Sequence, residues 1–170
     1  MDFWIVGIDH ELQSTKAETD TVILRSQKEH LESILKEGIV KRRIGFVSEE
    51  SKLHKPTIAC ELASTNIPPI PWINIIMTDS ERELAGIAEA LKKPRPGHPD
   101  YETRSIWIEH RIPEDEIRED FFIRQTLTGN KGADSILMLL GDLHVDAVAD
   151  KLRRMGHSVA ANHELFPIRR

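Results

Sequence analysis

Continuous apolar runs along the chain predict buried β-strands. Residues 3–8, 43–47, 72–76 and 135–140 are short, mostly aliphatic or aromatic segments, and residues 158–160 form a briefer run near the C-terminus. Short runs that stay apolar without alternation are typical of parallel strands covered on both faces. The run at 135–140 is the most apolar of them, and we expect it to be the central strand of the sheet.

Apolar residues at helical spacing lie between these runs. Leu24, Leu31 and Leu35 fall on one face of a predicted helix, and Gly38 is placed to end it. Further helices are predicted over 56–66, after a capping box of Ser80 and Glu83, from Pro113 to the turn at 129–132, and over 145–155.

The alternation of strands and helices indicates the fold class. Strands that alternate with helices form βα units, and these assemble into a largely parallel sheet. A length of 170 residues fits one domain. We therefore predict a single α/β domain over residues 1–170, with a mostly parallel open sheet flanked by helices on both faces.

Composition and charge argue against several classes of protein. The net charge of -5 and a pI near 5.9 argue against a nucleic-acid-binding protein, which usually carries a basic stripe. No run reaches the roughly 18 apolar residues that a membrane helix needs, and the acidic Asp2 argues against a signal peptide. The single cysteine, Cys60, forms no internal disulfide. We therefore predict a cytoplasmic protein that binds neither nucleic acid nor membranes.

Two histidines and two glutamates follow the predicted strands. His10 and His144 end matching Gly-x-x-His turns, and Glu49 and Glu50 follow the strand at 43–47. Sites in open parallel sheets form just beyond the carboxyl ends of the strands, so these side chains meet if the strands are neighbours. His and Glu are good ligands for zinc, manganese or iron, and equally good general bases for activating water. The pattern predicts a polar site, with these four residues as ligands if a divalent metal is bound.

Each of these residues also has a purely structural interpretation. A Gly-x-x-His tetrad arises often by chance, and His144 then merely occupies the first turn of a helix that Asp142 caps. Glutamate pairs usually decorate loops. Arg118 and Glu119 form either a solvated charge pair or part of the site, where Arg118 would bind a substrate anion. Helical periodicity does not separate these two alternatives.

The order of these motifs resembles a known superfamily. A Gly-x-x-His turn after the first strand, Glu after the second, an Arg-Glu pair in a late helix and an apolar strand ending in Gly-x-x-His are similar to the TraB/ChaN/erythromycin-esterase-like superfamily, which includes the TIKI-type metalloproteases. The resemblance implies a hydrolase; some members depend on a metal and others use His and Glu without one. It also implies a cleft formed by His10, Glu50 or Glu49, Arg118, Glu119 and His144.

This chain differs from the larger members of that superfamily in its length. They carry inserted helices that help to cover the site, whereas here the proline-rich loop from Lys93 to Arg104 is the candidate lid. The site would then be open, completed by a second subunit, or inactive.

Three functions remain open on the sequence. The first is a hydrolase that acts on an amide, ester or phosphoryl group of a small molecule or peptide. The second is a non-catalytic domain that binds a small anion or metabolite. The third is an assembly subunit, for example of a homo-oligomer, in which Trp72, Ile73, Ile75 and Ile76 form an edge that pairs with another chain.

Overall fold

The fold is built on one parallel sheet. The computed structural model describes residues 1–8, 22–51, 56–87 and 113–163. Five strands lie within these ranges in the order β3-β2-β4-β1-β5, and every neighbouring pair is parallel. The strands are β1 (Asp2–Ile8), β2 (Phe46–Glu49), β3 (Trp72–Asn74), β4 (Ser135–Gly141) and β5 (Ser158–His163).

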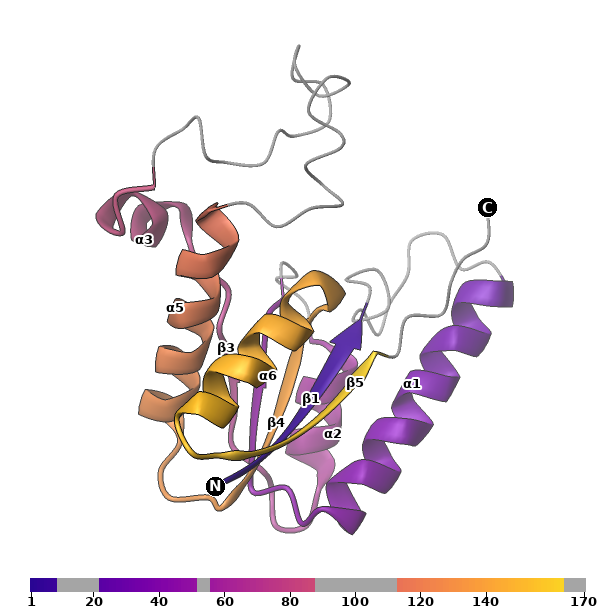
Figure 1. Ribbon diagram of the computed structural model, residues 1–170. Helices are drawn as coiled ribbons and strands as arrows, with labels where there is room; N and C mark the ends of the chain where they lie inside the picture. The colour runs from indigo at the N-terminus through magenta and orange to yellow at the C-terminus, as the bar shows by residue number, and fades with distance from the viewer. Residues whose placement is uncertain (9–21, 52–55, 88–112, 164–170) are drawn as a thin grey trace.

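Helices cover both faces of the sheet, so the domain has three layers (Figure 1). The predicted α/β fold is therefore confirmed. One face carries α1 (Val22–Lys41) and α2 (Ile58–Thr65), and the other carries α5 (Pro113–Gly129) and α6 (Val145–Arg154). The short helix α3 (Asp79–Leu84) lies next to the first turn of α5 (Figure 1). None of the helices in the described ranges combines the length and the apolar character needed to cross a membrane.

Two apolar clusters hold the layers together. Alternate residues of a strand point to opposite faces of the sheet. In β1, Phe3 and Ile5 pack toward α5 and α6, whereas Trp4 and Val6 pack toward α1 and α2. The same division applies to β4, which is buried on both faces and lies between β2 and β1. This is the central position predicted for the most apolar run.

The connections around β4 leave the sheet on opposite faces. The helices that follow β1 and β2 are α1 and α2, whereas β4 leads into α6 on the other face. A crevice opens where neighbouring connections diverge, and ligands of open α/β sheets bind there. The topology therefore predicts a ligand site at the carboxyl end of β4, beside its neighbours β1 and β2.

The first helix does not end at Gly38 as predicted. It continues to Lys41, and the chain turns through Arg43, whose φ is 51°. Gly38 has a packing role instead, because a Cβ built on it would lie 2.0 Å from Cη2 of the Trp4 ring. A glycine near a helix end can thus serve close packing rather than termination.

The predicted capping box was placed two residues too late. The Thr78 hydroxyl accepts a bond from the Glu81 N–H at 3.3 Å, and the Glu81 carboxylate accepts one from the Thr78 N–H at 2.8 Å. Ser80 and Glu83 therefore lie inside α3. The mistake arose because Thr-x-x-Glu and Ser-x-x-Glu overlap here, and both satisfy the capping rule.

The third strand is also shorter than predicted and stops at Asn74. The Asn74 side-chain oxygen accepts from the Ile76 N–H at 3.0 Å and from the Ser51 N–H at 3.2 Å. This side chain therefore turns the backbone out of the ladder. β3 is nevertheless an edge strand of the sheet.

We expect Gly38→Ala to destabilise the protein by about 1–3 kcal/mol, the range for overpacking a filled core. In an unobstructed helix the same change stabilises by about 1 kcal/mol, so the sign is diagnostic. The Trp4 ring cannot easily move, because its Nε1 donates to Asn162 at 3.1 Å and Arg42 lies 5.1 Å from the ring. Urea unfolding measures the change, with Ser33→Ala on the exposed side of α1 as control. A more stable Gly38→Ala protein would contradict the packing role.

Candidate functional site

A buried carboxylate joins β2, β4 and α5 at the carboxyl edge of the sheet. Glu50 follows β2, is fully buried, and accepts a hydrogen bond from the Gly141 N–H at 3.1 Å. Its other oxygen is ion-paired with the Arg118 guanidinium. The side chain of Glu50 therefore lies at the carboxyl end of β4.

The first turns of α5 direct charged residues toward this edge. Asp115, Arg118, Glu119 and Phe122 are spaced by three, one and three residues, which places them on one side of a helix. Arg118 also contacts Asp115 at 3.5 Å. The Phe122 ring lies between two of the polar groups, with Arg118 at 5.6 Å from its centre and the His144 ring edge-on at 5.5 Å.

His144 is paired with the second carboxylate of this helix. Its Nδ1 lies 3.3 Å from Glu119 Oε1, and both side chains are buried. A carboxylate only accepts hydrogen bonds when ionised, so this contact favours the tautomer with the proton on Nδ1. The Nε2 lone pair is then available to accept a proton. On the other side, Lys151 Nζ lies 3.5 Å from Glu119 Oε2.

Glu49 lies on the opposite face of the sheet from Glu50. It accepts hydrogen bonds from the Thr57 hydroxyl at 2.5 Å and from the Trp72 Nε1 at 2.9 Å. Thr57 is the N-cap of α2, so this carboxylate belongs to the α1 and α2 side. Strand alternation separates the two glutamates, and they do not form one ligand set.

The structure brings four of the predicted site residues together. Glu50, Arg118, Glu119 and His144 lie around Phe122, whereas His10 lies outside the described residues. Within the described ranges no three His, Cys, Asp or Glu side chains are arranged to hold a metal ion. The contacts explain this, since Glu50 is engaged by Gly141 and Arg118 while His144 faces Glu119. The bound metal remains a prediction.

A second histidine cluster lies at the same edge and was not singled out by the sequence. His163, at the end of β5, contacts Asp142 at 2.8 Å through Nδ1 and Asp146 at 3.1 Å through Nε2. The hydrogen bond to Asp142 is the main cause of a raised pKa of His163, although partial burial acts against it. Asp142 thus holds His163, in addition to beginning the turn after β4. No spacing rule links these residues, because strand order brings them together.

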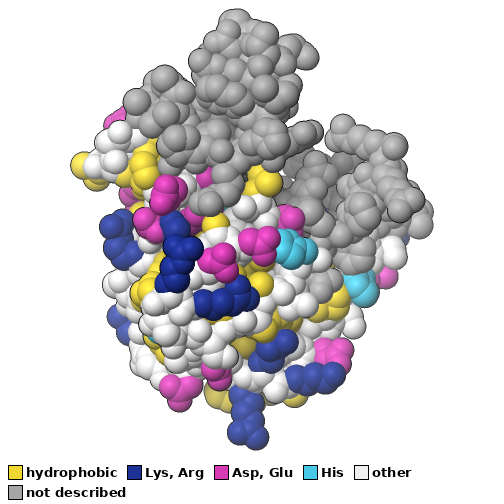
Figure 2. Space-filling view, in the orientation of Figure 1, with side chains coloured by type: hydrophobic (Ala, Val, Ile, Leu, Met, Phe, Trp, Pro, Cys, Tyr) yellow, Lys and Arg dark blue, Asp and Glu magenta, His cyan; other side chains and the backbone are white. Residues whose placement is uncertain are grey.

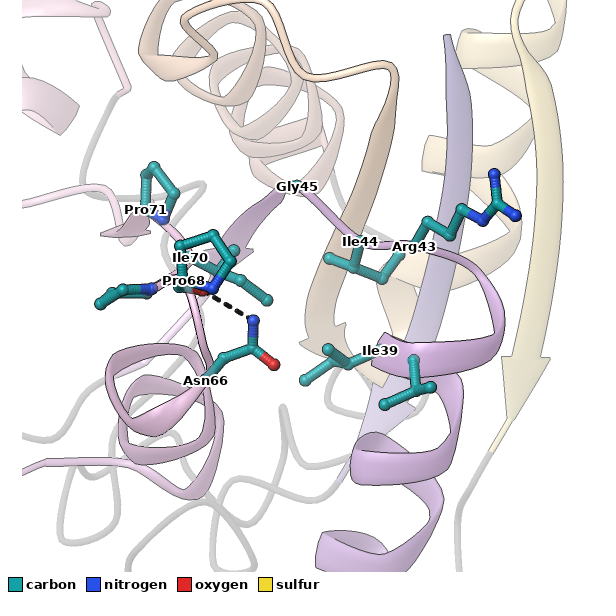
Figure 3. A pocket seen from close by; sticks show the side chains of 10 residues that line it. Ile39, Arg43, Ile44, Gly45, Asn66, Pro68, Ile70 and Pro71 are labelled. Atoms are coloured by element: carbon teal, nitrogen blue, oxygen red, sulfur yellow. Dashed lines mark hydrogen bonds between the residues drawn. The ribbon is translucent and has the colours of Figure 1, made fainter.

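A shallow groove lies at the other end of the sheet. It has a volume of about 350 Å³ and lies between the ends of α1 and α2 and the start of β2 (Figure 3). Ile39, Ile44 and Ile70 line it with prolines, and Asn66 donates to the Pro68 carbonyl at 2.7 Å on its rim. This groove is at the amino edge of the sheet. It is therefore separate from the charged cluster at the carboxyl edge, which consists of Glu50, Asp115, Arg118, Glu119 and His144.

The sequence did not identify Lys151, Asp115 or Phe122 as part of the charged cluster. The spacing of Asp115, Arg118 and Phe122 on α5 was a usable signal, because three residues and then four keep side chains on one face. Lys151 gave no such signal, since it lies on α6.

Comparison with protein-family models, with characterised proteins and with solved structures finds no match for this chain. The superfamily resemblance therefore stays a prediction.

We expect Glu50→Gln to lower the free energy of unfolding by about 3 kcal/mol, because it removes the closer of the two buried carboxylates that face the Arg118 charge. Glutamine keeps the shape of the side chain and can still accept from Gly141. Glu37→Gln is the matched control, since Glu37 forms an exposed pair with Lys41 four residues later on α1. Guanidinium unfolding compares the two variants. Equal and small effects would show that the Glu50 pair does not hold the edge together.

Replacing His163 by Asn should change the dependence of stability on pH. A raised pKa means that the folded protein binds this proton more tightly than the unfolded chain. The stabilisation is complete below the unfolded value of about 6.5 and is lost as the pH rises through the folded pKa. Thermal unfolding should therefore show the largest loss for the variant near pH 5.5 and little loss near pH 9. A loss that is the same at both pH values would refute the linkage.

Proposed function

We propose that the protein is a hydrolase in which His144 is the general base that activates water. The observation that carries this proposal is the contact between His144 Nδ1 and Glu119 Oε1 at the carboxyl end of the central strand. A carboxylate in this position orients the imidazole and stabilises the imidazolium that forms when Nε2 takes a proton. The burial of both side chains strengthens this electrostatic effect.

In this proposal Arg118 stabilises the negative charge that develops on the substrate. Its contacts with Glu50 and Asp115 use one N–H on each terminal nitrogen. A guanidinium has five N–H donors, so others remain for an oxyanion. His144 would take a proton from water as the water oxygen bonds to the carbonyl carbon, and negative charge would develop on the carbonyl oxygen. Collapse of this intermediate would break the bond to the alcohol or amine, which would leave with the proton that His144 returns.

The charge around Arg118 favours a neutral substrate over an anionic one. Among the described residues, the carboxylates of Glu50 and Asp115 already balance the Arg118 charge, so a phosphate ester bound to Arg118 would also meet these two carboxylates. A neutral ester or amide gains negative charge only in the transition state, where hydrogen bonds from Arg118 count most. The same balance disfavours the alternative of a sensor for a small anion.

The expected activity is hydrolysis of neutral p-nitrophenyl esters or neutral p-nitroanilides in preference to p-nitrophenyl phosphate. His144→Gln and Glu119→Gln should each reduce kcat/KM by roughly 100- to 10,000-fold, the usual range for loss of a general base. His30→Gln, on the exposed face of α1, is the matched control and should keep full activity.

Release of p-nitrophenol or p-nitroaniline measures the rates. Full activity in His144→Gln would exclude His144 as the base, and hydrolysis of none of the neutral substrates by the native chain would refute the proposal. A native preference for the phosphate ester would contradict only the argument about charge around Arg118.

A further inference from the structure

We propose that Lys151 is a positioning residue, which holds the Glu119 carboxylate so that one of its oxygens faces His144. This inference rests on the proposed function, because the orientation of Glu119 affects a rate only if His144 is the base. The two oxygens of Glu119 have different partners. Oε1 lies 3.3 Å from His144 Nδ1, and Oε2 lies 3.5 Å from Lys151 Nζ. The two contacts together fix the plane of the carboxylate.

Other groups of α5 hold the Lys151 ammonium in place. Its Nζ donates to the Glu116 carbonyl at 3.1 Å and to Asp120 Oδ1 at 2.5 Å. Glu116 precedes Glu119 by three residues of α5, and Asp120 directly follows it. An ammonium has three N–H donors, so two are directed by these contacts and the third is left for Glu119 Oε2. The ammonium therefore presents a fixed positive charge to this oxygen.

α6 brings Lys151 and His144 to the same carboxylate. His144 directly precedes α6, and Lys151 lies about two helical turns later. Residues at this spacing lie on the same side of a helix, and helical side chains tilt toward the N-terminus, so Lys151 extends back toward His144. α6 packs against α5, where Glu119 meets both residues. On the face that carries α5 and α6, basic side chains lie beside acidic ones (Figure 2).

The burial of Glu119 explains why its second contact matters. A buried carboxylate needs compensating charge or hydrogen bonds, and Glu119 is fully buried. In the proposed reaction the imidazole is neutral until it takes a proton from water, so Lys151 supplies positive charge before that step. The Lys151 side chain is 21% exposed, so solvent lies next to this side of the carboxylate. Without the ammonium, water entering there would compete with His144 for Glu119.

A role of Lys151 only in docking α6 on α5 makes a different prediction. The shortest contact of Lys151 is with Asp120, whose side chain is 67% exposed, and exposed ion pairs contribute little to stability. Docking would be weakened about as much by Asp120→Asn as by loss of the Lys151 charge. Positioning of Glu119 requires the Lys151 charge but tolerates Asp120→Asn, because the asparagine oxygen still accepts a hydrogen bond from the ammonium.

Lys151→Met removes the charge and keeps a long apolar side chain. It should lower kcat for the neutral p-nitrophenyl esters by roughly 10- to 100-fold with KM unchanged, since a misplacement of about 1 Å already costs about 100-fold. Lys151→Arg returns a positive charge to Glu119 and should recover most of the native kcat. Lys36→Met, which removes an exposed lysine of α1, is the matched control. Both Lys36→Met and Asp120→Asn should keep the native kcat.

The nitrogen chemical shifts of the His144 ring test the positioning without any substrate. NMR of the full chain in mildly alkaline buffer reports which ring nitrogen carries the proton, and His144→Gln identifies the signals. The native ring should carry the proton on Nδ1, and Lys151→Met should move a larger share to Nε2, because the Glu119 contact is loosened.

An unchanged tautomer in Lys151→Met would overturn the role of Lys151. So would losses of kcat that are equal in Lys151→Met and Asp120→Asn. The tautomer separates this inference from the proposed hydrolase. A native chain that hydrolyses none of the neutral substrates, with a tautomer that Lys151→Met shifts, would refute the hydrolase and leave the positioning of Glu119 supported.

Discussion

The hydrogen bond from the Gly141 N–H to the Glu50 carboxylate is the contact on which the carboxyl edge depends. The backbone of Glu50 still bonds to the Leu139 carbonyl, so the next rung of a regular parallel ladder would join the Gly141 N–H to the Glu50 carbonyl. The Glu50 carboxylate accepts this hydrogen bond instead, at 3.1 Å. β2 can therefore leave the sheet while the Gly141 N–H keeps a partner, and the Glu50 carboxylate is held beside β4.

A buried carboxylate requires a partner, and this requirement determines how α5 is oriented. Arg118 supplies the opposite charge, since an unpaired carboxylate in this position would cost several kcal/mol. Once Arg118 faces the sheet, Asp115 and Glu119 on the same side of the helix face it as well. The carboxylate that holds His144 is therefore part of the same inward face as the ion pair, and the chemistry of the site rests on a structural contact.

The sequence predicted what depends on local pattern and missed what depends on strand order. The apolar run at 135–140 was enough to identify the central strand, because only a strand covered on both faces is apolar throughout. Glu49 and Glu50 were predicted to be ligands of one site, although consecutive residues of a strand point to opposite faces, and only the structure shows that Glu50 is the one that faces α5. The contact of His163 with Asp142 joins residues whose strands flank β1, so no spacing could reveal it. Glycine is a residue type that often ends helices, but Gly38 instead makes room for the Trp4 ring. The position of that ring cannot be predicted from the residues around Gly38.

Gly7 of the first Gly-x-x-His turn and His144 of the second are explained by different physical causes. A Cβ on Gly7 would lie 2.4 Å from Asp142 Oδ1 and 2.6 Å from Val145 Cγ2, so packing between β1 and the turn after β4 demands glycine whatever the protein does. That glycine is weak evidence for function. His144 is different, because packing alone does not require an imidazole to face a buried carboxylate, and an apolar side chain would avoid the cost of burying both groups. The proposed function therefore rests on the contact between His144 and Glu119 rather than on the repeated Gly-x-x-His motif.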